Sequence, residues 1–324
     1  MLNILGIGSA YGATLLDNST LSAIDKRFQD KSYFNRTGIE SRYTTLPLDY
    51  IKQTGNRDPR GAPTAALQTP TDLAFQATIS ALERAEVQPE KIGLIVGETC
   101  TPIQSTPSEG QRIGKRLNIK VPAYDLAAAE MTLWAQLSAL SKWKANRLES
   151  YALCLSANTP TQNICYGSED SDNDAPFLFG DAACTLVVSA QHPGKLSVLE
   201  SGFVSLGPNG IVADLPTYGC GKGSIENWHT VIGDKLEKVL VQLVSANGQE
   251  KLDRLRIIAT PSDGIVLERL ARAANLPVRA VLQNVTQRGD SFGSSAGSVL
   301  ADNWEKFGRG EEIVVVQSGY GGVG

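Results

Sequence analysis

The sequence predicts an α/β fold with mainly parallel sheets, built from two diverged copies of one unit. Short apolar runs typical of buried strands alternate along the chain with amphipathic segments typical of helices. This alternation favours parallel sheets with helices packed on their faces. Several of these segments recur in the same order roughly 160 residues further along the chain, which indicates an internal duplication. We therefore expect an N-terminal half over residues 1–170 and a C-terminal half over residues 171–324.

The chain begins with a predicted buried strand over residues 2–8, followed by a short helix over residues 19–30. Residues 35–45 form a turn that leads into an extended segment. Residues 46–70 contain several prolines and glycines and show little periodicity, so we expect a surface excursion there.

The recurring segments are pairs of a helix and the strand that follows it. The first helix is predicted to begin at Pro70, and its apolar residues Leu73, Ala77 and Ala81 share one face. The pairs are 70–86 with 92–96 and 130–145 with 151–155 in the first half, and 226–244 with 255–259 and 294–307 with 313–316 in the second.

The composition excludes several classes of protein. Because 30 Lys and Arg face 34 Asp and Glu, the formal net charge is −4, and we expect no nucleic-acid partner. No apolar run approaches the ~20 residues of a membrane-spanning helix. The N-terminus lacks the basic and apolar regions of a secretory signal, so we expect a cytoplasmic protein without a membrane span.

The cysteines and histidines limit the chemistry further. The cysteine count is odd and no pair has CxxC spacing, which argues against a disulfide framework and a zinc site, and we expect neither metal nor cofactor. Only two histidines are present for acid–base chemistry. These residues are Cys100, Cys154, Cys165, Cys184, Cys220, His192 and His229.

A series of short motifs then follows in a fixed order along the chain. They are Arg36-Thr-Gly-Ile39 with Arg42, Asp72-Leu-Ala, Thr101-Pro102 with Pro107-Ser108, Tyr124-Asp-Leu-Ala-Ala-Ala129, Phe179-Gly-Asp-Ala-Ala183 and Gly319-Tyr-Gly-Gly322. In this order they resemble the ketoacyl-acyl-carrier-protein synthase III family of the thiolase superfamily, over nearly the whole chain. The resemblance implies a thiolase fold, a five-layered αβαβα core of two duplicated halves.

The resemblance also implies an activity and its partners. Members of the family are usually homodimers, and they move an acyl group from coenzyme A or acyl carrier protein to a cysteine. They then condense that acyl group with a malonyl thioester. The chemistry needs a thiolate at a helix N-terminus, and a His and an Asn that donate to the thioester oxygen.

This chain departs from the family at all three catalytic positions. The family's cysteine follows Asp125-Leu-Ala-Ala-Ala129, where this chain has Glu130. Thr260 stands where the histidine is expected, at the end of the strand over 255–259. The third family motif is Gly-Asn-Thr-Ser-Ala-Ala-Ser. Aligned with residues 292–298, it places the asparagine at Gly293 or Ser294.

Other positions carry implied binding roles. Arg36, in the first motif, is the implied substrate-binding arginine, and Ser32 replaces the tryptophan that stacks on the coenzyme A adenine in the family. Cys100 precedes the Thr101-Pro102 loop near the family's acyl tunnel, and Gly321 could supply a backbone N–H to an oxyanion.

Three functional hypotheses stay open. In the first, Glu130 only fills the vacated pocket, and the protein lacks condensing activity and pairs with an active synthase paralogue. In the second, it is an acyltransferase, hydrolase or decarboxylase that uses Glu130 on acyl-carrier-protein or acyl-CoA thioesters. In the third, condensation is intact and the motif alignment is wrong. The dimer could be a homodimer or a heterodimer.

Overall fold

The structure is a computed structural model. It describes residues 1–58, 60–143, 151–167, 173–202, 204–205, 213–216, 220–227, 229–230, 233–247, 254–260, 264–319 and 322–323. Within these ranges, no helix is both long and apolar enough to cross a bilayer.

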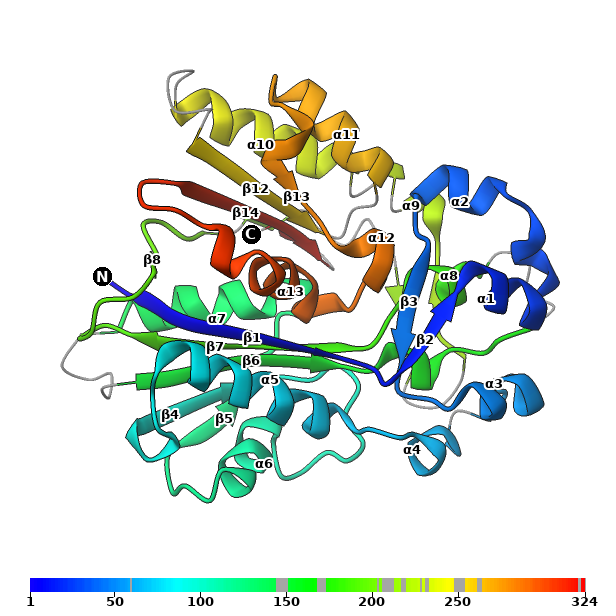
Figure 1. Ribbon diagram of the computed structural model, residues 1–324, viewed down its shortest axis with the longest axis horizontal. Coiled ribbons are helices and arrows are strands. Elements are labelled where there is room, and N and C mark those ends of the chain that lie inside the picture. The colour runs from blue at the N-terminus through cyan, green and yellow to red at the C-terminus, as the bar shows by residue number, and fades with distance from the viewer. Residues whose placement is uncertain are drawn as a thin grey trace.

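Two sheets and three layers of helices alternate through the molecule (Figure 1). Helices α5 (Pro70–Ala85) and α6 (Glu109–Arg116) cover the outer face of the first sheet. Helices α7 (Thr132–Ser141) and α13 (Ser295–Asp302) lie between the two sheets. Helices α10 (Gly233–Asn247) and α11 (Gly264–Ala273) cover the second sheet. This αβαβα order confirms the predicted fold.

In the part of the chain that the structure describes, the first sheet has six strands and the second has five. The first has the order β5 (Ala123–Asp125), β4 (Ile92–Gly97), β6 (Tyr151–Asn158), β7 (Ala182–Ser189), β1 (Asn3–Tyr11) and β8 (Leu196–Ser197). The second has the order β13 (Val281–Leu282), β12 (Leu255–Thr260), β14 (Glu312–Gly319), β15 (Gly322–Val323) and β9 (Val204–Ser205).

The first sheet is mixed, whereas we predicted mainly parallel pairing. Strand β4 runs parallel to β5 and β6, but β7 runs antiparallel to β6 and β1. Strand β6 ends at Asn158, and β7 begins at the paired residue Ala182. The connection therefore starts and ends at the same end of the two strands, so they pair antiparallel. Strands β7 and β8, which follow residue 170, belong to this first sheet. The predicted boundary at residue 170 stays a prediction.

Helix α5 packs directly on strand β1. The helix begins at Pro70, as predicted, and a capping box of Thr69 and Asp72 precedes and stabilises its first turn. A Cβ atom at Gly8 would overlap the Ala77 carbonyl oxygen. Because Gly6 and Gly8 have no side chain on the face of β1 toward α5, the helix approaches closely and buries its alanine face.

Residues 46–70 correct a prediction. We expected a surface excursion, but the segment forms helices α3 (Leu48–Thr54) and α4 (Ala62–Ala65) and buries Ile51 completely. The Asn56 amide nitrogen donates to three backbone carbonyls between residues 161 and 164, which anchors the segment. The sequence did not indicate these helices because they are short and bury single side chains, which leaves no hydrophobic periodicity.

Smaller elements form one end of the molecule (Figure 1). They are β2 (Thr14–Asp17), α1 (Asn18–Ile24), α2 (Ser32–Thr37), β3 (Ser41–Thr44), α8 (Ala175–Leu178), α9 (Ile225–Asn227) and α12 (Val285–Arg288). Strands β10 (Ala213–Asp214) and β11 (Lys222–Gly223) form a separate antiparallel pair.

Several predicted helices are shorter than expected. The segment predicted as one helix over 226–244 contains the separate helices α9 and α10. The segment over 294–307 gives α13, which ends at Asp302 and is followed by a short 3-10 turn. The Asn303 side chain donates to the Val299 carbonyl oxygen and so satisfies a group at this helix end.

Two cysteines form a disulfide that the sequence analysis argued against. Cys165 and Cys220 are joined across 55 residues of sequence. Cys100, Cys154 and Cys184 are free. Short-range spacing cannot show a pair whose approach depends on the fold.

Candidate functional site

Glu130 lies between the two sheets, in the 3-10 turn η3 (Ala129–Met131) that leads into α7. The Thr132 hydroxyl donates to the Ala129 carbonyl and accepts from the Ala128 N–H, which holds this turn in place. Ala129 has a φ of 49°, in the left-handed region. The turn places Glu130 inside the protein, with 7% of its surface exposed.

Thr260 ends β12 and lies beside a small cavity that Asp290 and Ser295 also line. Its hydroxyl is buried and has no hydrogen-bond partner. A threonine hydroxyl is neutral, so it cannot supply the positive charge that an imidazolium would.

Gly293 and Ser294 do not present an amide to Glu130. A Cβ atom on Gly293 would lie 2.6 Å from the Ser156 hydroxyl and 3.0 Å from the Ala129 carbonyl oxygen, so the position has no room for a side chain. The Ser294 hydroxyl donates toward the carbonyl oxygens of Ser291 (2.9 Å) and Ala182 (3.1 Å). Its predicted catalytic role stays a prediction without a geometric basis.

Asp290 is a buried carboxyl group on which the charge of Glu130 acts, and sequence reasoning missed it. Asp290 is 3% exposed and accepts hydrogen bonds from the Ser295 hydroxyl and the Phe292 N–H. Burial raises its pKa to about 7, and the nearby charge of Glu130 adds to the shift. Asp290 follows Gly289, as the asparagine follows the glycine in the family motif. An alignment of the motif that begins at Gly289 would have identified Asp290 as a candidate.

Glu98 is a second carboxyl group that the sequence analysis missed. It follows β4 directly and is 1% exposed. The Ser156 hydroxyl donates to its Oε2 (2.6 Å), while its Oε1 has no partner. Burial raises the pKa of Glu98 to about 8, and the charges of Asp125 and Glu130 add to the shift. A charged residue directly after an apolar strand was the available signal.

Glu98, Glu130 and Asp290 together form the carboxyl cluster. Because like charges in a buried site oppose one another's ionisation, neutral pH favours a mixture of protonated and ionised carboxyl groups. Such a cluster can donate and accept protons. It cannot provide the positive field that stabilises an enolate or an oxyanion.

The free thiols do not replace the missing nucleophile. Cys100 follows Glu98 closely in sequence, and its N–H donates to the Asn158 side chain. The residue as a whole is exposed, but protein atoms around its sulfur desolvate the thiol. This desolvation and the charges of Glu98 and Glu130 raise the pKa of the thiol well above its usual value. Burial raises the pKa of Cys154 to about 12. These thiols stay protonated and are poor nucleophiles.

The two arginines of the motif Arg36-Thr-Gly-Ile39 with Arg42 lie in different surroundings, one at the surface and one in the core. Arg36 is exposed in the last turn of α2, at the end of the molecule away from α7 (Figure 1). Arg42 is fully buried, and its guanidinium donates to the Leu16 and Phe177 carbonyls and to the Asn18 side chain. Arg42 therefore supports the fold. Gly321 lies outside the described residues.

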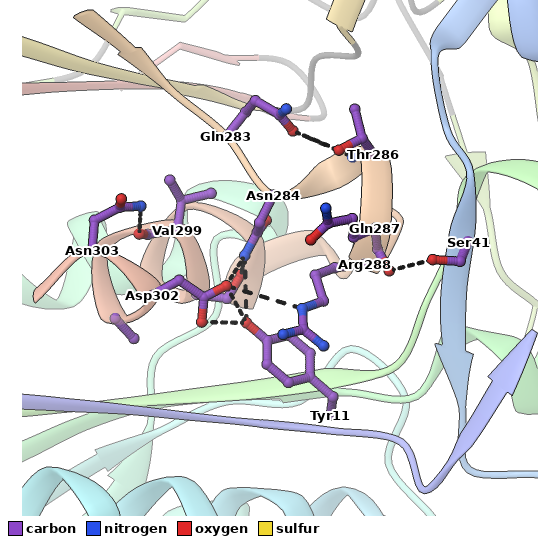
Figure 2. Close-up of polar contacts among 12 residues, drawn as sticks. Tyr11, Ser41, Gln283, Asn284, Thr286, Gln287, Arg288, Val299, Asp302 and Asn303 are labelled. Atoms are coloured by element: carbon purple, nitrogen blue, oxygen red, sulfur yellow. Dashed lines mark hydrogen bonds and ion pairs between the residues drawn. The ribbon is translucent and has the colours of Figure 1, made fainter. Parts of the chain in front are cut away.

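The cavity beside Thr260 and Asp290 is only about 10 Å³, room for about one water molecule. Asn284 lines this cavity and belongs to a cluster of hydrogen-bonded side chains (Figure 2). There the Tyr11 hydroxyl bonds to Asp302, and the Asn284 amide donates to both. The Arg288 guanidinium lies 4.1 Å from the Tyr11 ring centre. The cavity is too small for an acyl chain.

Within the described residues, no group of three or more His, Cys, Asp or Glu side chains is arranged to hold a metal ion.

Comparisons with known proteins show which proteins this chain resembles. No family model matches the chain. It is 23% identical over 330 residues to a β-ketoacyl-acyl-carrier-protein synthase III of Pseudoalteromonas atlantica, covering 98% of this chain and 96% of the relative. It is 28% identical over 315 residues to the synthase III of Alkalilimnicola ehrlichii, covering 92% and 88%.

A solved structure agrees with this relationship. The crystal structure of 3-oxoacyl-acyl-carrier-protein synthase III from Aquifex aeolicus matches with a TM-score of 0.82 and 22% identity, over 100% of this chain and 98% of that chain. The protein thus has the fold of the thiolase superfamily. Its sequence resembles those of the synthase III proteins over nearly the whole chain, as its motifs predicted.

Proposed function

We propose that the protein lacks condensing activity and acts as a subunit that pairs with an active synthase III paralogue in acyl-thioester biosynthesis of the fatty-acid or polyketide type. The observation that carries the proposal is the set of side chains at the catalytic positions. Glu130, Thr260 and, at the asparagine position, Gly293 or Ser294 provide no thiolate, no imidazole and no side-chain amide. Removing one oxyanion donor costs about 100- to 1,000-fold in rate, and here both donors and the nucleophile are replaced.

An open sheet edge supports the pairing. Within the described residues β5 pairs with β4 alone, so its other edge carries backbone groups without strand partners. Tyr124 on this strand and Ile103 in the loop before α6 are exposed apolar residues, at 37% and 43%. An exposed strand edge readily accepts a strand of another chain. Acyl carrier protein or acyl-CoA thioesters would then be substrates of the complex.

To test the proposal, this protein is mixed with an intact synthase III from the same organism, and the resulting monomers, dimers and complexes are separated by size-exclusion chromatography with light scattering. Each protein alone and the mixture are also assayed with acyl-CoA and malonyl acyl carrier protein. We expect a heterodimer, no condensation by this protein alone, and a changed rate or product length in the mixture. Condensation by this protein alone would contradict the proposal, as would the absence of any complex.

Two variants locate the interface. We expect Tyr124→Lys to abolish the heterodimer because it adds a charge to the pairing edge. Phe34→Lys is the matched control, since Phe34 is an aromatic residue of similar exposure, 42%, on the distant helix α2. Equal effects of the two substitutions would exclude the β5 edge.

The carboxyl cluster favours a second candidate function, acid–base chemistry on acyl thioesters. One carboxylate would accept a proton from water while a neighbouring acid donates one to the leaving thiol. We expect hydrolysis of acyl carrier protein thioesters by the wild type and its loss in Glu130→Gln and Asp290→Asn. Absence of hydrolysis by the wild type would remove this candidate, and the 10 Å³ cavity already weighs against it.

A further inference from the structure

A second cavity lies outside the two sheets, at the start of α6. We call it the α6 cavity. It has a volume of about 220 Å³ and lies between the first turns of α5 and α6, under the loop of residues 102–107. Hydroxyl groups line much of it, from Thr71, Thr99, Ser105 and Ser108. Its size and polar lining suit a small polar molecule.

The floor of the α6 cavity contains a buried carboxyl group with a free position for a hydrogen bond. Glu109 is 4% exposed. The Thr71 hydroxyl donates to its Oε2 (3.1 Å), but its Oε1 is buried without a partner. A buried acceptor left without a donor costs about 1–3 kcal/mol, so a ligand that donates to Oε1 would recover this energy.

Arg112 brings the opposite charge to the same cavity. It lies three residues after Glu109, on the same face of α6. The two side chains both line the cavity, and the charge of Arg112 acts to lower the pKa of Glu109. The Arg112 Nε donates to the Pro107 carbonyl (3.1 Å), and the Gln104 amide oxygen, when turned toward it, accepts from both terminal nitrogens. Two guanidinium N–H groups therefore remain for a ligand.

The N-terminus of α6 is not available to an anion. The Asp125 carboxylate accepts from the Glu109 and Gly110 N–H groups at 2.8 and 2.9 Å. The Ser108 hydroxyl accepts from the Gln111 N–H. Because Asp125 and Ser108 already bind these backbone groups, phosphate binding at a free helix end does not explain the cavity. The remaining recognition groups are one carboxyl and one guanidinium.

We propose that the α6 cavity binds a small zwitterion of the amino-acid class, with its ammonium group on Glu109 and its carboxylate on Arg112. The hydroxyl groups of the lining would hydrogen-bond the remaining polar atoms of the ligand. This binding site is separate from the carboxyl cluster. Because Ile103 and Asp125 line it and also lie at the proposed pairing edge, binding is tested on this protein without a partner.

The test measures binding by isothermal titration calorimetry on the full-length protein with three probes. L-Alanine carries both charges, ethylamine only the ammonium, and propionate only the carboxylate. We expect L-alanine to bind at least about tenfold more tightly than either single-charge probe. Equal affinity of L-alanine and one of the other probes would overturn the assignment, as would no binding of L-alanine.

Variants assign the two charges. We expect Glu109→Gln to weaken L-alanine by at least about tenfold, and Arg112→Gln to reduce L-alanine to the affinity of ethylamine. Lys115→Gln is the matched control, because Lys115 is an exposed cation on the same helix. Circular dichroism and the unfolding midpoint identify any variant that fails to fold, and propionate binding by Glu109→Gln is then a second readout of an intact site. Wild-type affinity in Glu109→Gln would overturn the proposal.

Discussion

The carboxyl cluster and the α6 cavity both contain buried carboxyl groups whose ionisation is opposed by burial, yet their surroundings differ. The charge of Glu130 raises the pKa values of Glu98 and Asp290 further, and Asp125 adds to the shift of Glu98. Asp125 and Asp72 also raise the pKa of Glu109, but there the charge of Arg112 acts in the opposite direction. The cavity beside the cluster has about 10 Å³, whereas the α6 cavity has about 220 Å³.

A raised pKa alone therefore does not identify a binding site. A buried carboxyl without space and without a counter-charge mainly costs stability as the pH rises. A buried carboxyl with space, an unpartnered oxygen and a nearby cation can recover that cost by binding a ligand. Substitutions in the two regions should therefore change different measurements.

The largest expected effect is at Glu98. Its pKa is about 8 in the folded protein and near 4.5 when unfolded, so only the folded state retains the proton between these values. Stability contributed by this group is therefore lost as the pH rises from about 4.5 to 8. Glu98→Gln does not titrate, so we expect it to gain roughly 3 kcal/mol relative to the wild type between pH 5.5 and pH 8.

Urea unfolding at pH 5.5 and pH 8 measures this change. Glu83→Gln, an exposed position on α5, is the control and should follow the wild type at both values. If Glu98→Gln and the wild type lose the same stability between pH 5.5 and pH 8, the cluster does not hold a neutral Glu98.

Asp125 connects the two regions, and its removal has the next largest effect. It binds the first N–H groups of α6, so we expect Asp125→Ala to cost about 2 kcal/mol at pH 5.5. Its charge also raises the pKa values of Glu98 and Glu109. At pH 8 its loss relieves repulsion in the ionised molecule, so we expect a smaller cost there.

Thermal unfolding at the two pH values tests the link. Asp125→Asn separates the contributions, since it removes the charge and keeps an oxygen acceptor for the helix. A cost of Asp125→Ala that is larger at pH 8 than at pH 5.5 would show that the charge does not act on the two sites.

The fold could be predicted because its signals are local and repeated. The apolar run of β4 and the capped alanine face of α5 each carry their own pattern, and the motifs set their order. The position of Glu130 could be predicted for the same reason, because the preceding motif fixes the register.

The rest of the site depends on residues brought together by the fold. Glu98 and Ser156 meet because β4 and β6 are neighbours in the sheet, and Asp290 comes from the other half of the chain. The motif alignment at residues 292–298 passed over Asp290 because small residues there match the motif in more than one register. Glu109 looks like an ordinary acidic residue in the first turn of a helix, and only its burial distinguishes it.

The smallest expected effect is at Thr71, which acts on Glu109 alone. Its hydroxyl donates to Oε2 and lowers the pKa of Glu109, which burial raises to about 7. Thr71→Val keeps the shape and removes the donor, so we expect a loss of about 1 kcal/mol at pH 8, where Glu109 is ionised, and a smaller loss at pH 5.5. Urea unfolding at both values measures this difference. The same substitution should leave the pH dependence caused by Glu98 unchanged, because the hydroxyl touches only the α6 cavity; a change in both would mean that the two regions titrate as one.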